Sequence, residues 1–181
     1  MPKEFKGVKN SLLDCIGNTP LVRLNKVVGD TPSIIAAKCE HLNPSGAIKD
    51  RIGLFLIEQA EKRGELKPGG TIVEAPSGNT GMALAIAGAI KDYRLIFVIP
   101  DKMSKEKINA LRAFGAKVVV TPTNVAPEDP RSYYSVAKRI AESTPNCFYA
   151  NQYHNPDNPE AHYRSTGPEI WEQTQGTIDT L

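Results

Sequence analysis

The sequence is poor in cysteine and histidine, and the few that it has form no recognisable metal or disulfide pattern. Cys15, Cys39 and Cys147 are far apart, include no CxxC pair, and share no metal-ligand spacing with the three histidines. The sequence therefore predicts no bound metal and no disulfide framework. The thiols are expected to be buried or incidental, in a reducing compartment.

Long apolar runs and runs of one charge are also missing. The first 14 residues contain no apolar core of signal-peptide length, and no segment reaches membrane-spanning length. The net charge is +2, with basic and acidic residues interleaved, which argues against a nucleic-acid or membrane surface. We therefore expect a cytoplasmic protein that binds small molecules, with no nucleic-acid partner.

Short apolar runs do occur, and they alternate with helical patterns. The runs are rich in Val and Ile and bounded by Gly, Pro or polar residues, which is typical of buried strands: 33–40, 71–75, 95–100, 117–122 and 147–151. Between them, apolar residues at helical spacing predict helices over 50–64, 78–92, 104–115 and 131–143. This alternation predicts an α/β fold with a mostly parallel sheet and helices on both faces. Ligands of such sheets bind beyond the carboxyl ends of the strands.

The last part of the chain has a different pattern. Residues 158–176 read as a helical stretch interrupted around Gly167 and Pro168, and 177–181 read as the start of another strand. Because a complete protein rarely ends where a strand begins, we expect the natural chain to continue beyond residue 181.

Two loops carry candidate functional residues. In "NPSGAIKDR" (43–51), Lys49 follows a glycine turn, where it is either a solvated cation or a held, nucleophilic amine. In "EAPSGNTGMALA" (74–85), two glycines and the polar Ser77, Asn79 and Thr80 open a helix. They suit a carboxylate or similar anion, although Ser, Asn and Thr are also ordinary helix caps. The loop lacks the P-loop ending and the dinucleotide GxGxxG spacing.

Taken together, these motifs resemble a known family. "NPSGAIKDR" followed some thirty positions later by "SGNTG" is similar to the pyridoxal-phosphate enzymes of the tryptophan-synthase β-subunit type, which include cysteine synthases and cystathionine β-synthases. The same order of motifs continues along practically the whole chain, with "IGNTPLVRL", "KPGGTIVEA", "DKMSKEKINALRAFGAKVVVTPTN" and "NQYHNPDNPEAHY". The resemblance implies a tryptophan-synthase β-like fold with its second lobe incomplete. It also implies a homodimer.

The resemblance assigns a role to each candidate residue. Lys49 is the expected attachment point of pyridoxal 5′-phosphate and the base that removes the substrate α-proton. Asn79 is expected to hydrogen-bond the phenolic oxygen of the cofactor. Ser77 and Thr80 are expected to bind the substrate carboxylate together with Gln152, and Tyr153 is either a wall of the second-substrate pocket or a half-buried core aromatic.

The resemblance also implies a reaction and a domain arrangement. "AKCE", "KMSKEK" and "NPEAHY" look more like cystathionine β-synthase, which joins serine to homocysteine, than like cysteine synthase, which uses O-acetylserine and sulfide. A non-catalytic interaction module is the alternative from another class. The expected divisions are an N-terminal segment over 1–42 that packs partly on the missing lobe, an αβ lobe over 43–160 and the start of the C-terminal lobe over 161–181.

The chain departs from the family pattern in two respects. The family usually has threonine before "SGNTG", and here that position is Pro76, which has neither a hydroxyl nor an N–H. The loop that holds the cofactor phosphate in the family, and the residue that faces the pyridine nitrogen, are both expected beyond residue 181. The sequence is therefore interpreted as the amino-terminal part of an enzyme, inactive by itself.

Overall fold

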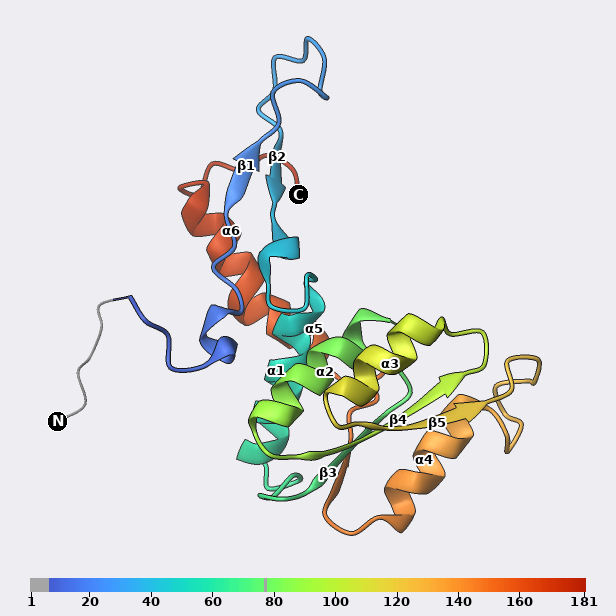
Figure 1. The fold of residues 1–181 in the computed structure, drawn as a ribbon. Helices are drawn as coiled ribbons and strands as arrows, with labels where there is room; N and C mark the ends of the chain where they lie inside the picture. Colours follow the sequence, from blue (N-terminus) through green and yellow to red (C-terminus); the bar gives the residue numbers. More distant parts are fainter. Residues whose placement is uncertain (1–6, 77) are drawn as a thin grey trace, which may run out of the picture.

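A four-stranded parallel sheet in the order β5-β4-β3-β6 forms the centre of the computed structural model, which describes residues 7–76 and 78–181 (Figure 1). The strands are β3 (Thr71–Glu74), β4 (Arg94–Pro100), β5 (Lys117–Thr121) and β6 (Cys147–Tyr149). All three pairings are parallel, and β3 lies between β4 and β6. The predicted α/β class and four of the five predicted strands are confirmed, although β5, at the edge of the sheet, is buried only at Thr121.

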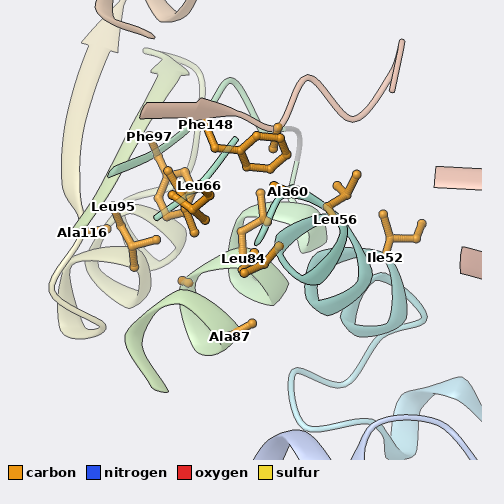
Figure 2. Close-up of a cluster of buried hydrophobic side chains, with 14 of the residues drawn as sticks. Ile52, Leu56, Ala60, Leu66, Leu84, Ala87, Leu95, Phe97, Ala116 and Phe148 are labelled. Atoms are coloured by element: carbon orange, nitrogen blue, oxygen red, sulfur yellow. The ribbon is translucent and has the colours of Figure 1, made fainter. Parts of the chain in front are cut away.

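Helices cover both faces of this sheet, as the alternating pattern predicts. One face carries α1 (Lys49–Lys62), α2 (Asn79–Ile90) and α3 (Lys105–Ala113), and the other carries α4 (Tyr133–Ser143). Figure 2 shows how Leu56, Leu84 and Phe97, from two helices and a strand, meet in the larger core. In α2 nearly every residue after the first turn is buried, because this helix lies between α1, α3 and the sheet.

Helices α1 and α2 cross very closely. A Cβ built on Gly53 would lie 2.7 Å from the Cβ of Ala83 and 2.9 Å from its carbonyl carbon, so only glycine permits this contact. Gly53 is four residues after the start of α1, and Ala83 is four residues after the start of α2. The crossing therefore lies one helical turn, about 5.4 Å, from the first residue of each helix.

The N-terminal part extends away from the sheet as an arm beside α6 (Figure 1). It contains the 3₁₀ turns Leu12–Cys15 and Glu40–Leu42 and the antiparallel pair β1 (Leu21–Arg23) and β2 (Ala36–Lys38). The prediction of a buried strand over 33–40 in the parallel sheet was wrong. Only three of those residues are strand, they pair with β1, and Ile34 is 72% exposed. A short apolar run has the same sequence pattern in a buried strand and in an exposed hairpin.

The C-terminal part is helical in three consecutive pieces. It runs through α5 (Asp157–Ala161), a π-helical turn (His162–Thr166) and α6 (Gly167–Gln173). The predicted interruption is thus a π turn, and Pro168 follows it in the first turn of α6, where a missing N–H is tolerated. The predicted strand at 177–181 was wrong, because those residues form no strand and contain only a bend at Asp179. No helix in the described parts of the chain is long and apolar enough to cross a membrane.

Candidate active site

The loop that carries Lys49 is held in place by buried polar side chains. Gly46 has φ of +81°, and its N–H donates to the carbonyl oxygen of Asn43 over 2.8 Å, which closes the turn. The Asn43 side chain is buried and accepts from the N–H of Gly17. Asp50 accepts from the backbone N–H and the hydroxyl of Ser45. Lys49 itself is half-buried at the first position of α1, so its backbone is fixed while its side chain retains access to solvent.

Lys49 and Asn79 begin neighbouring helices. Each lies four residues before the contact between Gly53 and Ala83, and residues four apart share a helix face. The two side chains therefore start from the facing sides of α1 and α2, one turn from the closest approach. Asn79 is exposed at this end of the crossing. The structure thus brings together two loops that are thirty positions apart in the sequence.

The start of α2 lines a pocket, and Lys107 is the cation beside it. Its lining residues come from the loop after β3, from α2 and from the α3 region: Pro76, Gly78, Asn79, Met82, Met103, Lys107 and Leu111. Gly78 has φ of +80°, and a Cβ built there would lie 3.8 Å from the Lys107 amine. Because glycine at the N-cap has no side chain to cap the helix, the first-turn N–H groups and Lys107 together favour an anion. Lys107 was missed from the sequence.

Thr80 and Gln152 form a buried pair between two strand-end loops. The Thr80 hydroxyl donates to Oε1 of Gln152 over 2.6 Å, and the two residues are 1% and 5% exposed. This donation leaves the Gln152 amide group as the remaining donor of the pair. Tyr153, the next residue, is 53% exposed and therefore lies at the surface and not in the core. Ser77 lies outside the described residues.

Sequence reasoning missed Glu74, the last residue of β3. Its side chain is 2% exposed and accepts from the backbone N–H of Ala75 over 2.9 Å and of Gln152 over 3.2 Å. Burial raises the pKa of the Glu74 carboxyl to about 7, although these N–H groups act in the opposite direction. An acidic residue that ends an apolar strand just before a ligand loop was the available signal.

His162 was also missed, and it lies in the π turn close to the Lys49 region. Its Nδ1 is 2.8 Å from the hydroxyl oxygen of Thr166. Burial lowers the pKa of the His162 imidazole, and the charges of Lys49 and Arg51 lower it further. A π turn often marks a functional site, and this one places an imidazole within electrostatic range of Lys49. Over residues 7–76 and 78–181, no three His, Cys, Asp or Glu side chains are grouped so that they could hold a metal ion.

The sequence of the chain is similar to those of known enzymes. The chain is 47% identical over 176 residues to a cystathionine beta-synthase of Dictyostelium discoideum, which covers 97% of the chain and 35% of that protein. It is 45% identical over 168 residues to a cysteine synthase B of Pseudomonas aeruginosa, covering 93% of the chain and 55% of that protein. The chain thus spans about a third to a half of the length of these relatives.

A solved structure agrees with the sequence relatives. The crystal structure of a hydrogen sulfide-producing enzyme from Fusobacterium nucleatum superposes with a TM-score of 0.87 at 38% identity, covering 95% of this chain and 55% of that one. The family model described as pyridoxal-phosphate dependent enzyme matches residues 12–181. That match includes the Lys49 loop, the start of α2 and the Thr80–Gln152 pair. The chain therefore belongs to the family of pyridoxal-phosphate-dependent enzymes.

Proposed function

We propose that the chain is part of a β-replacement enzyme that condenses L-serine with L-homocysteine to L-cystathionine. The observation that carries this proposal is the meeting of a held lysine, an anion-favouring helix start and the buried Thr80–Gln152 pair at one end of α1 and α2. A β-replacement enzyme needs an amine that holds the cofactor and acts as the base, for which we propose Lys49. It also needs a binding site for the amino-acid carboxylate, for which we propose the helix start and the Thr80–Gln152 pair. Relatives named cystathionine beta-synthase at 46–49% identity support the choice of reaction.

The residues present fit pyridoxal phosphate. Lys49 offers a half-buried primary amine on a rigid turn, and Gly78 leaves room for close approach beside Asn79 because no side chain fills that space. When bound, the cofactor supplies an electron sink for the substrate α-carbon. Lys49 would hold the cofactor covalently, and Asn79 would hydrogen-bond the oxygen on its ring.

The protein groups then have distinct tasks. The amine of Lys49 takes the proton from the substrate α-carbon, since a lysine held in a partly dry site can act as a base. The amide of Gln152, whose side chain is held by the Thr80 hydroxyl, receives the substrate carboxylate together with Ser77 and the backbone N–H of Thr80. We assign Tyr153, which follows Gln152 and is exposed, to the wall that the second substrate passes.

Cysteine synthesis from O-acetylserine and sulfide is the second candidate. It is favoured by relatives named cysteine synthase at 45–47% identity and by the neighbour named as a hydrogen sulfide-producing enzyme. The carboxylate site and the lysine serve both reactions equally, because the first substrate is a β-substituted alanine in each. A non-catalytic interaction module is the third candidate, and it would need none of the polar placement described above.

The test is a product assay on the whole protein loaded with cofactor. Serine with homocysteine should give cystathionine by mass spectrometry, and O-acetylserine with sulfide should give cysteine at a lower kcat/KM. A higher kcat/KM for O-acetylserine with sulfide than for serine with homocysteine would assign the protein to cysteine synthesis. Absence of both products, with bound cofactor verified by its absorption, would favour the non-catalytic module.

Several broader expectations accompany this function. We propose a homodimer in the cytoplasm. Residues 43–160 form the N-terminal αβ lobe, 161–181 begin the C-terminal lobe, and 1–42, of which 1–6 lie outside the described residues, pack partly on that C-terminal lobe. The 181-residue segment alone is expected to be inactive, because it covers only 35% and 55% of the two sequence relatives described above. Sedimentation of the whole protein and an activity assay of the segment test these expectations.

Replacing Pro76 with threonine should strengthen serine binding. Pro76 is buried beside Gly81, where a Cβ would lie 2.9 Å from its ring, and it directly precedes the residues assigned to the carboxylate. A regained hydroxyl donor to a charged group contributes roughly 1.5–3 kcal/mol. We therefore expect the serine KM to fall by up to about a hundredfold, since about 1.4 kcal/mol is a factor of ten. The kcat should change less.

Valine at the same position is the matched control. Val has the shape of Thr without the hydroxyl, so both variants lose the rigidity of proline and only Pro76→Thr gains a donor. The serine KM of Pro76→Val should stay at or above that of the parent. Equal KM values for the two variants would show that this position does not reach the substrate carboxylate.

A further inference from the structure

Glu74 connects the two loops that carry the substrate-binding pair. Its Oε1 accepts from the N–H of Ala75, which begins the loop from β3 into α2. Its Oε2 accepts from the N–H of Gln152, in the loop after β6. The strands β3 and β6 are parallel neighbours, with Val73 opposite Tyr149, so their carboxyl ends lie at the same edge of the sheet. One buried carboxyl therefore joins the loops that hold Thr80 and Gln152.

Gln152 is held from three directions. Glu74 holds its N–H, the side chain of Asn158 donates to its carbonyl oxygen over 3.0 Å, and Thr80 donates to its side chain. The preceding residue, Asn151, has φ of +41°, and its backbone also hydrogen-bonds to the Glu74 carboxyl. Asparagine adopts this left-handed conformation more readily than most residues other than glycine. The bond from Asn151 to the Glu74 carboxyl stabilises it further.

We propose that Glu74 is a positioning residue whose carboxylate fixes the Gln152 loop to the end of β3, so that the Thr80–Gln152 pair keeps the geometry that receives the substrate carboxylate. The inference rests on the proposed function, because it takes the amino-acid carboxylate as the ligand of that pair. Glu74 does not itself touch the substrate. Its effect passes through the backbone N–H of Gln152.

The role requires the ionised form. A carboxylate accepts from several N–H groups at once, whereas a protonated carboxyl presents an O–H donor to one of them and loses that bond. Since burial raises the pKa of Glu74 to about 7, the full set of N–H bonds to its carboxylate is present above neutral pH, and one of them is lost as the pH falls below it.

The ionisable groups around Glu74 do not titrate in the same pH range as Glu74 itself. Tyr149 on β6 has its pKa raised to about 12, chiefly by burial and then by the Glu74 charge. Tyr134 on α4 has its pKa raised to about 12, chiefly by its hydrogen bond with Tyr133. Both phenols are neutral near pH 7, and no cation of the described residues contributes to the Glu74 pKa.

A negative Glu74 also repels the incoming carboxylate, and this effect has the opposite pH dependence. The N–H dipoles of Ala75, Asn151 and Gln152 point at the Glu74 carboxylate and compensate part of its charge. We therefore expect positioning to outweigh repulsion, so that serine binding weakens as Glu74 is protonated.

The experiment compares the whole, cofactor-loaded protein with Glu74→Gln between pH 6 and pH 8. Gln has the same shape, but its amide group cannot accept from both N–H groups. The ratio of wild-type to variant kcat/KM for serine cancels every pH dependence that the two proteins share. It should rise by up to about tenfold across this range, since the ionised fraction of a group with pKa near 7 rises from about a tenth to about nine-tenths. The change should lie in KM.

An infrared titration provides the readout that does not depend on catalysis. The carbonyl band of a protonated carboxyl should appear in the wild type with a midpoint near pH 7 and should be absent from Glu74→Gln. A flat or falling kcat/KM ratio in an active enzyme would overturn the positioning role and leave the proposed function intact. An inactive wild type that binds no amino acid at any pH would overturn the proposed function, and with it the inference that rests on it. No band titrating near neutral pH would overturn the ionisation step.

Discussion

Replacing Lys49 with alanine should remove the covalent attachment of pyridoxal phosphate and lower kcat by about a thousandfold or more. A positioned acid or base alone contributes about 10²–10⁴-fold, and here the same amine also holds the cofactor. The turn around Gly46 and the hydrogen bonds that Ser45 donates to Asp50 keep the loop in place in the variant, because none of them involves the Lys49 side chain. The folded structure should therefore persist while the chemistry is lost.

The measurement is made on the whole protein with cofactor added. The visible absorption of the lysine-bound cofactor should be absent in Lys49→Ala. Lys62, the last residue of the same helix, provides the matched control, and Lys62→Ala should keep both the absorption and the activity. If borohydride reduction and digestion of Lys49→Ala still yield a lysine peptide carrying the cofactor, another lysine is the attachment point.

Replacing Glu169 with alanine should lower the free energy of unfolding by about 3 kcal/mol, the lower end of the range for breaking a buried ion pair. Glu169 in α6 accepts from two nitrogens of Arg51 at 2.7 Å each and from the Lys38 amine at 2.8 Å. The Arg51 side chain is only 2% exposed, so the variant leaves a buried guanidinium with Glu40 as its remaining carboxylate partner. These hydrogen bonds connect α6 to α1 and to β2 of the N-terminal arm.

The effect of Glu169→Ala should depend on pH in a defined direction. Burial alone would raise the pKa of Glu169, but the hydrogen bonds from Arg51, Lys38 and the N–H of Asn18 lower it to about 2. A carboxyl with a lowered pKa in the folded state stabilises the fold above its unfolded pKa of about 4.5 and loses that contribution as the pH falls toward 2. The difference between parent and variant should therefore be full at pH 7 and smaller at pH 3.

Denaturant unfolding followed at both pH values measures this difference. Glu142→Ala is the control, because the pair between Glu142 and Lys138 is 3.9 Å long with both side chains at least 66% exposed. Such surface pairs contribute roughly 0.5 kcal/mol or less, so this variant should change stability little. Equal losses of unfolding free energy in Glu169→Ala and Glu142→Ala would mean that the buried network stabilises the fold no more than a surface pair does.

The sequence by itself determined the helices and strands of the sheet and the position of the candidate lysine. Helices α1 to α4 and strands β3 to β6 follow from apolar spacing, which is a local property, and the Lys49 loop and the start of α2 follow from local motifs. The same local pattern misassigned residues 33–40, because an apolar run does not specify whether a sheet or solvent lies beside it.

Only the tertiary structure decided which residues meet. Thr80 and Gln152 are 72 positions apart, and Arg51 and Glu169 are 118 apart, so no periodicity relates them. Gly53 permits the close crossing that places Lys49 beside Asn79, and the parallel pairing of β3 with β6 brings Gln152 to Glu74. The burial of Glu74 likewise arises from neighbours that are distant in sequence. The environment of a charged group, and hence its pKa, depends on these long-range contacts, which is why Glu74 was not found from the sequence.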